Sequence, residues 1–104
     1  DRGRRYELTE LLVSVGRESF NGIKLHDTEA SRRHVELYRT EDSYRLVDLQ
    51  SSNGTFVNNQ KVQEHLLKNG DRLEIGCTRM VFTDSAALPG DAEEPDVRRA
   101  SLVT

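Results

Sequence analysis

The chain has 104 residues, the length of one compact domain with little room for a second core. Its 18 acidic and 15 basic residues give a net charge of −3, whereas nucleic-acid-binding domains usually carry a basic excess. The single cysteine, Cys77, excludes an internal disulfide, and no apolar run approaches the roughly 18 residues that a membrane helix needs. These features favour an intracellular domain, cytoplasmic or nuclear, that contacts neither nucleic acid nor membrane directly.

Short strands with one buried face are predicted along the chain, because apolar residues recur at every second position. The alternating positions are Leu11, Val13 and Val15, then Val35 and Leu37, then Tyr44 and Leu46, then Leu73 and Ile75. Turn signals separate these runs at Asn21-Gly22, Asn53-Gly54 and Asn69-Gly70-Asp71. The best helix candidate is one short turn near residues 64–68. The pattern therefore predicts an all-β protein, and we favour a two-sheet β-sandwich.

The last twenty residues differ in composition from the rest of the chain. Both prolines, Pro89 and Pro95, fall in this segment, together with four acidic residues. Such a composition is typical of a linker or a disordered tail. We therefore expect one folded domain over residues 1–84 and a flexible tail over residues 85–104.

A possible modification site lies in this predicted tail. Residues 98–101 read Arg-Arg-Ala-Ser, which resembles the substrate site of a basophilic kinase and makes Ser101 a candidate for phosphorylation. Twenty flexible residues span about 25 Å, so a phosphorylated tail could reach the domain itself. Tail-mediated self-association is therefore a further hypothesis.

Three polar segments interrupt the predicted strands, the first at residues 15–19, the second at residues 29–37 and the third at residues 50–55. Loops of a sandwich gather at the two ends of its sheets. The third segment, residues 50–55, is longer than the two-residue turn that a hairpin needs. If the three segments converge, they bring together Arg17, Ser31, Arg32, Ser52 and Asn53. This set consists of hydrogen-bond donors and contains no acid. It suits a phosphate group, which brings acceptor oxygens and about two negative charges, and arginine can hold two such oxygens at once.

The ordered set of motifs resembles the forkhead-associated (FHA) domain family, from about residue 6 to Phe82. The matching motifs are Gly16-Arg17, Ser31-Arg32-Arg33-His34, Ser52-Asn53-Gly54-Thr55, Val57-Asn58, Gly70-Asp71 and Ile75-Gly76. The resemblance implies a sandwich of about ten or eleven short, mostly antiparallel strands that binds phosphothreonine peptides through loops at one end. It also implies a non-enzymatic module of signal transduction, acting downstream of a Ser/Thr kinase, without cofactor or metal.

The resemblance assigns a role to each matching loop residue. The residues that match phosphate contacts are Arg17, Ser31, Arg32 and Ser52, where Arg32 contacts either the phosphate or the peptide backbone. Asn53 matches an amide that bonds the peptide main chain beside the phosphothreonine. The residues that match structural supports of the site are Gly16, His34, Gly54 and Gly76.

Two departures from the family pattern are visible. Asn59 stands where the family usually has glycine, and asparagine is the residue that otherwise best tolerates a positive φ. Ala30 and Val35, which flank the Ser31–His34 motif, have the small and large volumes exchanged relative to the usual pattern. Neither departure removes a predicted phosphate contact.

Three other functions are possible for such a sequence. Ser31 and His34 could suggest a hydrolase, but no obvious acid is available to orient the histidine. The potential metal ligands His26, His34, His65 and Cys77 are scattered, without the paired spacing of a zinc site. The remaining alternative is a constitutive, phosphorylation-independent interaction or oligomerisation domain that uses a sheet face. An exposed apolar patch on that face would favour it.

Overall fold

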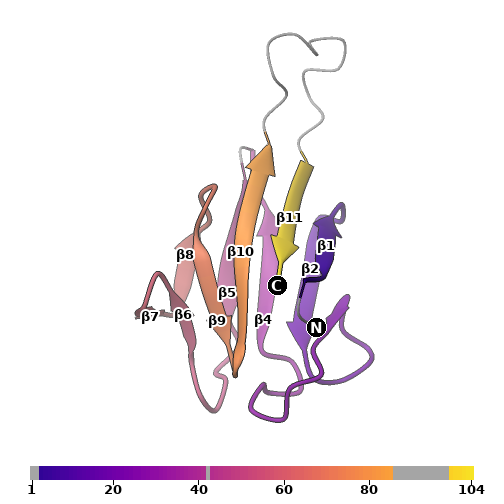
Figure 1. The fold of residues 1–104 in the computed structure, drawn as a ribbon, viewed down its shortest axis with the longest axis vertical. Coiled ribbons are helices and arrows are strands. Elements are labelled where there is room, and N and C mark those ends of the chain that lie inside the picture. The colour runs from indigo at the N-terminus through magenta and orange to yellow at the C-terminus, as the bar shows by residue number, and fades with distance from the viewer. Residues whose placement is uncertain (1–2, 42, 86–98) are drawn as a thin grey trace, which may run out of the picture.

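The computed structural model describes residues 3–41, 43–85 and 99–104, and in these residues it contains strands and no helix (Figure 1). The strands are β1 (Arg5–Leu8), β2 (Leu12–Gly16), β3 (Ile23–Lys24), β4 (Val35–Arg39), β5 (Tyr44–Asp48), β6 (Thr55–Val57), β7 (Gln60–Val62), β8 (Glu64–Leu66), β9 (Arg72–Ile75), β10 (Thr78–Ser85) and β11 (Arg99–Val103). The short helical turn considered near residues 64–68 is thus replaced by β8. No described helix could cross a membrane.

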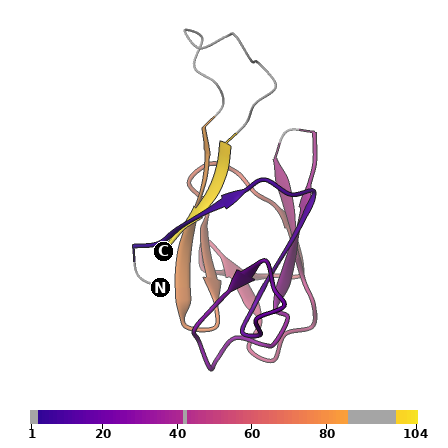
Figure 2. The same cartoon turned by 90° about the vertical axis from the view of Figure 1, so that its right-hand side faces the viewer.

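The strands form two sheets that face each other, as Figure 2 shows edge-on. One sheet has six strands in the order β1-β11-β10-β9-β6-β7, and the other has five in the order β3-β2-β4-β5-β8. Every paired strand is antiparallel to its neighbour except β3, which runs parallel to β2. The predicted β-sandwich is therefore confirmed.

The core fills the space between the sheets with the alternate residues that the sequence pattern predicts. The five-stranded sheet contributes Val13, Val15, Val35, Leu37 and Leu46, and the six-stranded sheet contributes Leu73, Ile75, Met80, Phe82 and Leu102. Each of these side chains is almost fully buried. Burial of one such side chain contributes about 1.5–3 kcal/mol, so this core is the main support of the loops described below.

The C-terminal strand corrects the expectation of a flexible tail over residues 85–104. Ser85 still belongs to β10, and residues 99–103 form β11, which lies between β1 and β10 and pairs with both. Leu102 is completely buried. The reason is that β11 fills the gap between two other strands and completes the core, which the average composition of the segment does not reveal. Residues 86–98 lie outside the described residues.

The same strand corrects the assignment of Ser101 as a phosphorylation site. Ser101 stands opposite Glu7 of β1 and Thr83 of β10 in the sheet, and it is only 3% exposed. A kinase must take its substrate residue into an active site, and a residue in the middle of a sheet cannot enter one while the domain is folded. Tail-mediated self-association through this residue therefore loses its basis.

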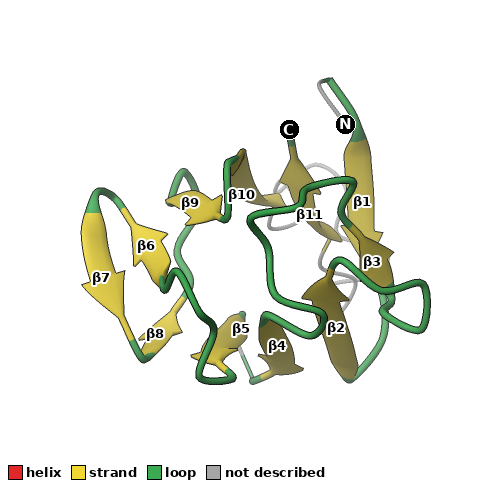
Figure 3. Ribbon diagram, turned by 90° about the horizontal axis from the view of Figure 1, so that it is seen from below, coloured by secondary structure: helices red, strands yellow, loops and turns green. Residues whose placement is uncertain are grey.

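The loops that carry the predicted site lie at one end of the sandwich. The connections between β2 and β3, β3 and β4, and β5 and β6 all lie at the lower end in Figure 1, with the β9–β10 turn. Figure 3 looks onto this end and shows the loops side by side. We refer to this end as the loop rim.

Candidate functional site

Ser31 is the point at which the three predicted loops meet. The main-chain N–H of Arg17 donates to the carbonyl oxygen of Ser31 at 3.0 Å. The main-chain N–H of Ser52 donates to the Oγ of Ser31, also at 3.0 Å. Residues separated by up to 35 positions in sequence therefore lie together on the loop rim.

The side chain of Arg17 is held in place by its own loop neighbour. Its Nε donates to the carbonyl oxygen of Ala30 at 3.1 Å, and the side chain is half-buried. Among the described residues, the two Nη groups of Arg17 have no hydrogen-bond acceptor. A guanidinium fixed through Nε and open at both Nη groups can offer two parallel donors to an anion.

Gly16 allows the end of β2 to approach the Ser31–His34 segment closely. A Cβ atom at Gly16 would lie 2.2 Å from the carbonyl oxygen of Arg32, which is far too short a contact. That oxygen accepts the N–H of Glu18 at 3.2 Å and the Nδ2 of Asn21 at 2.7 Å. The main chain of Arg32 is therefore fixed, while its side chain is exposed.

His34 joins the second loop to the third. Its imidazole is completely buried, and its Nδ1 accepts the main-chain N–H of Ser31 at 3.0 Å. With Nδ1 as an acceptor, Nε2 carries the proton and donates to the carbonyl oxygen of Gly54 at 2.9 Å. The ring thus contacts the main chain of Ser31, whereas the hydroxyl of Ser31 is engaged by Ser52. This is a structural clamp and differs from the nucleophile–base geometry of a hydrolase.

Asp48, which the sequence analysis did not single out, clamps both ends of the loop between β5 and β6. Its carboxylate accepts the N–H of Ser51 at 3.1 Å, the hydroxyl of Ser51, and the hydroxyl of Thr55 at 2.7 Å. Burial alone would raise the pKa of Asp48, but these hydrogen bonds outweigh burial and hold the pKa below its usual value. The sequence does contain a local signal for this contact, because aspartate and serine side chains near a turn often form hydrogen bonds with neighbouring main-chain groups.

Asn53 is in contact with an acid that the predicted donor-only set did not include. The Nδ2 of Asn53 donates to the carbonyl oxygen of Glu29 at 2.7 Å and to its carboxylate Oε2 at 3.2 Å. Both residues are exposed on the loop rim. The two residues lie 24 positions apart, so no local pattern could have revealed the pair.

A cation–π pair lies next to the loop that carries Arg17. The guanidinium of Arg33 lies 5.2 Å from the centre of the Phe20 ring, and Phe20 is 61% exposed. Such a contact stabilises an exposed arginine by about 0.5–1 kcal/mol. Arg33 thus adds a third arginine to the two loops that carry Arg17 and Arg32.

The outer face of the five-stranded sheet offers a second surface. Leu12, Tyr38 and Leu66 are 48%, 40% and 45% exposed, and the strand register places them in one row. Arg45 interrupts this row between Tyr38 and Leu66 and lies 3.5 Å from the carboxylate of Glu64. Leu12 and Tyr38 are therefore direct neighbours in the row, whereas Arg45 separates Leu66 from them.

The fold is a two-sheet β-sandwich with three loops that converge at one end, and comparison with known proteins defines its family. The model of the FHA domain family matches residues 13–76, which is more than half of the chain. The chain therefore belongs to the FHA domain family.

Among curated proteins, the chain is 39% identical over 84 residues to the oxoglutarate dehydrogenase inhibitor of Corynebacterium jeikeium, covering 81% of this chain and 58% of that protein. It is 40% identical over 80 residues to the glycogen accumulation regulator GarA of Mycobacterium tuberculosis, covering 77% of this chain and 49% of GarA. The chain thus spans about half the length of these two relatives.

Solved structures give the same family. The FHA domain of FhaA, crystallised in complex with the intracellular domain of Rv3910, superimposes with a TM-score of 0.72 at 40% identity, covering 75% of this chain and 86% of that one. A structure from a study of phosphothreonine-dependent FHA domain interactions also gives a TM-score of 0.72 at 40% identity, covering 75% of this chain and 81% of that one.

Proposed function

We propose that this domain binds phosphothreonine-containing peptides and so mediates phosphorylation-dependent association between proteins in Ser/Thr kinase signalling. The observation that carries this proposal is the meeting of Arg17 and Ser52 at Ser31, which gathers a guanidinium, a hydroxyl-bearing loop and main-chain N–H groups on one rim. Membership of the FHA family supports the same conclusion, as do the solved relatives that concern phosphothreonine-dependent interactions.

Each loop residue has a role in this proposal. The phosphate is held by Arg17, Ser31, Arg32 and Ser52, and Asn53 bonds the main chain of the peptide beside the phosphothreonine. Gly16, His34 and Gly54 support the site through the close approach and the hydrogen bonds described above. No step of catalysis is required, because binding alone joins the two proteins.

The expected affinity follows from the number of charge-assisted hydrogen bonds. Each such bond contributes about 1.5–3 kcal/mol, whereas association costs at least ~4 kcal/mol. Three or four bonds to the phosphate, with main-chain contacts, therefore predict a binding free energy near −8 kcal/mol, which corresponds to a Kd of about 1 μM. A preference for threonine over serine would come from a contact to one methyl group, about 1–3 kcal/mol.

The named relatives suggest how such binding is used. One is named as an inhibitor of oxoglutarate dehydrogenase and another as a regulator of glycogen accumulation, so both names describe regulators. By analogy, we propose that this chain is part of an intracellular regulator whose partner is a phosphorylated protein. The kinase that phosphorylates this partner acts upstream.

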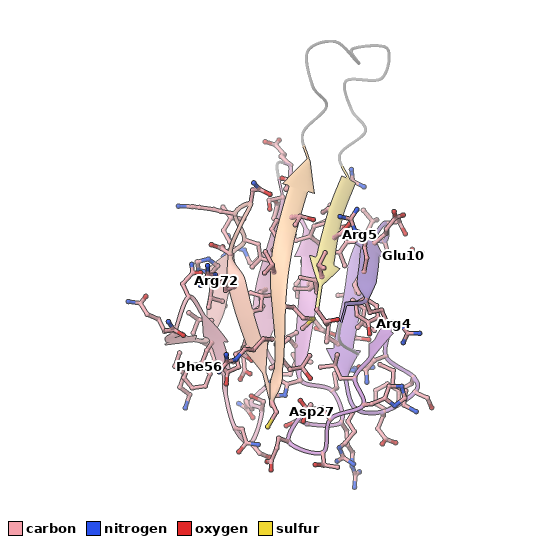
Figure 4. All side chains as sticks on the ribbon, viewed as in Figure 1. Arg4, Arg5, Glu10, Asp27, Phe56 and Arg72 are labelled. Atoms are coloured by element: carbon pink, nitrogen blue, oxygen red, sulfur yellow. The ribbon has the colours of Figure 1, made fainter. Side chains whose placement is uncertain are left out.

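A binding experiment with matched variants tests the proposal. Screening against an oriented phosphothreonine peptide library first selects a ligand. Fluorescence anisotropy then measures the affinity of the domain for this phosphopeptide and for its unphosphorylated form. We expect the Arg17→Ala variant to lose at least about 100-fold in affinity while remaining folded, because two charge-assisted bonds are lost. The control is Arg5→Ala, which removes an exposed arginine in the upper half of Figure 4, away from the loop rim.

The opposite result has a specific meaning. If the unphosphorylated peptide binds as tightly as the phosphopeptide, the domain is a constitutive interaction module. The row formed by Leu12, Tyr38 and Leu66 is then the surface to mutate.

A further inference from the structure

Glu29 contacts Asn53, the residue that bonds the peptide main chain in the proposed function. Both hydrogen bonds between the two residues use the Nδ2 of Asn53, one to the carbonyl oxygen of Glu29 and one to its carboxylate. Within the described part of the chain, the Oδ1 of Asn53 has no donor. The contact with Glu29 therefore fixes the amide with its acceptor oxygen still available to a peptide N–H.

The turn that carries Glu29 is anchored to the opposite sheet. The Oδ1 of Asp27 accepts the N–H of Glu29 at 2.9 Å. The Oδ2 of Asp27 accepts the N–H of Cys77 and the hydroxyl of Thr78, both at 2.7 Å. Figure 4 shows Asp27 at the lower end, beside the β9–β10 turn. Burial alone would raise the pKa of Asp27, but these hydrogen bonds hold the pKa below its usual value, so the carboxylate remains an acceptor near neutral pH.

Glu29 is thus an acid held at a defined place on a rim that carries three arginines and the further acids Glu18 and Asp27. Its Oε2 contacts Asn53, and within the described residues its Oε1 has no donor. A peptide main chain that bonds Asn53 must pass close to this carboxylate. The side chain of the peptide residue next to the phosphothreonine then comes within the range at which charges interact.

We propose that Glu29 is a specificity-determining residue that selects phosphothreonine peptides with lysine or arginine directly beside the phosphothreonine and disfavours an acid there. This inference rests on the proposed function, because it assumes that the phosphopeptide lies against Asn53. The ligand class is a phosphothreonine flanked by a basic residue, in which the phosphate faces Arg17 and the flanking cation faces Glu29.

The expected size of the preference is modest, because Glu29 is exposed. Solvent-exposed ion pairs change an equilibrium constant by up to about fivefold, and a like-charged pair has an effect of similar size in the opposite direction. The ratio of affinities for lysine and glutamate peptides should therefore be about tenfold at low salt. Salt screens exposed charges, so the ratio should shrink as ionic strength rises.

The test measures this ratio in three proteins. Two pairs of phosphothreonine peptides carry either lysine or glutamate, one pair immediately before and one immediately after the phosphothreonine. Affinities are measured with the unaltered chain, with Glu29→Gln and with Glu10→Gln. Glutamine keeps an oxygen that can accept from Asn53 but removes the charge. Glu10 is an exposed acid in the upper half of Figure 4, away from the loop rim, so it is the matched control.

We expect a lysine-to-glutamate affinity ratio of about tenfold at one of the two positions in the unaltered chain and in Glu10→Gln, and a ratio within twofold in Glu29→Gln. An equal affinity for both peptides in the unaltered chain, or an unchanged ratio in Glu29→Gln, would overturn this inference and leave phosphopeptide binding in place. If no phosphothreonine peptide binds at all, the proposed function fails and this inference fails with it.

Discussion

His34 and Gly54 are joined by a hydrogen bond of 2.9 Å from the buried imidazole to the main-chain carbonyl oxygen, twenty residues away in sequence. The same ring holds the N–H of Ser31 on its other nitrogen. One side chain therefore sets the distance between the loop that carries Ser31 and the loop that carries Ser52 and Asn53.

Replacing His34 with alanine should reduce both stability and binding. The substitution leaves the N–H of Ser31 and the carbonyl oxygen of Gly54 without their buried partner, and each unsatisfied group costs about 1–3 kcal/mol. We expect the free energy of unfolding, measured in urea, to fall by about 2–4 kcal/mol. Phosphopeptide affinity should fall at least about tenfold, because the two loops are no longer fixed relative to each other. An affinity equal to that of the unaltered domain would contradict the role of this clamp.

Gly16→Ala should disturb the site through the main chain alone. The new Cβ would meet the carbonyl oxygen of Arg32 at 2.2 Å, so β2 or the Ser31–His34 segment must shift. We expect a loss of about 1–3 kcal/mol in stability, as for other overpacked positions, and at least about a tenfold loss of phosphopeptide affinity.

The matched comparison for this substitution is Gly70→Ala in the turn before β9. Gly70 has a positive φ, of 91°, which Gly16 does not have, and a Cβ there meets nothing within 4 Å. Its replacement should cost about 1–2 kcal/mol of stability through backbone strain and leave affinity unchanged. Equal effects of the two substitutions on affinity would count against a specific role for Gly16.

Acid should weaken the domain partly through Asp48. Because the pKa of Asp48 is lowered in the folded state from the ordinary 3.8, the unfolded chain binds its proton first as the pH falls. The stabilisation is therefore complete well above pH 3.8 and is lost as the pH falls through 3.8 towards the lower folded value. Urea unfolding at pH 7 and at pH 3 should show a smaller loss for Asp48→Asn than for the unaltered chain. The variant should also be the less stable of the two at pH 7.

Other carboxylates provide the internal reference for this measurement. Hydrogen bonds also lower the pKa of Asp27 and Asp71 against the opposing effect of burial, and both residues remain in the Asp48→Asn variant. The variant should therefore keep part of the acid sensitivity. An identical loss of stability in both proteins would mean that Asp48 does not contribute.

The C-terminal strand should be needed for stability. Leu102 is completely buried, so Leu102→Ala should lower the free energy of unfolding by about 2–5 kcal/mol. Leu11→Ala is the control, because Leu11 is 76% exposed and its truncation should change stability by less than about 0.5 kcal/mol. If both variants unfold at the same urea concentration, β11 is not part of the core in solution.

The strands that carry the core were predictable because their signal is local. Alternation at Val13, Val15 and Leu37 depends only on the strand period of two, so a single sequence suffices. Asn59 was predicted to tolerate a positive φ, and this is confirmed by its φ of 70° in the turn between β6 and β7. The turn has two residues, Asn58 and Asn59, which suits a tight hairpin.

What could not be predicted depends on partners that are distant in sequence. The segment from residue 99 onward follows a stretch with two prolines and four acidic residues, and it becomes a strand because β1 and β10 offer a pairing site on both sides. The contact of Glu29 with Asn53 likewise exists only when two loops meet. Sequence motifs therefore identified the loop residues, whereas the acid beside them required the folded arrangement.

The position of β11 between β1 and β10 also determines where attachments can be made. Because β1 and β11 are neighbours, as Figures 1 and 2 show, the main-chain N–H of Gly3 donates to the carbonyl oxygen of Thr104 at 2.9 Å, so the first and the last described residues lie together. A fluorophore or a fused polypeptide joined to either end would start from the same margin of the six-stranded sheet. A reporter pair placed on the two ends would therefore be close in the native domain and separate on denaturation, which gives an optical readout of its integrity.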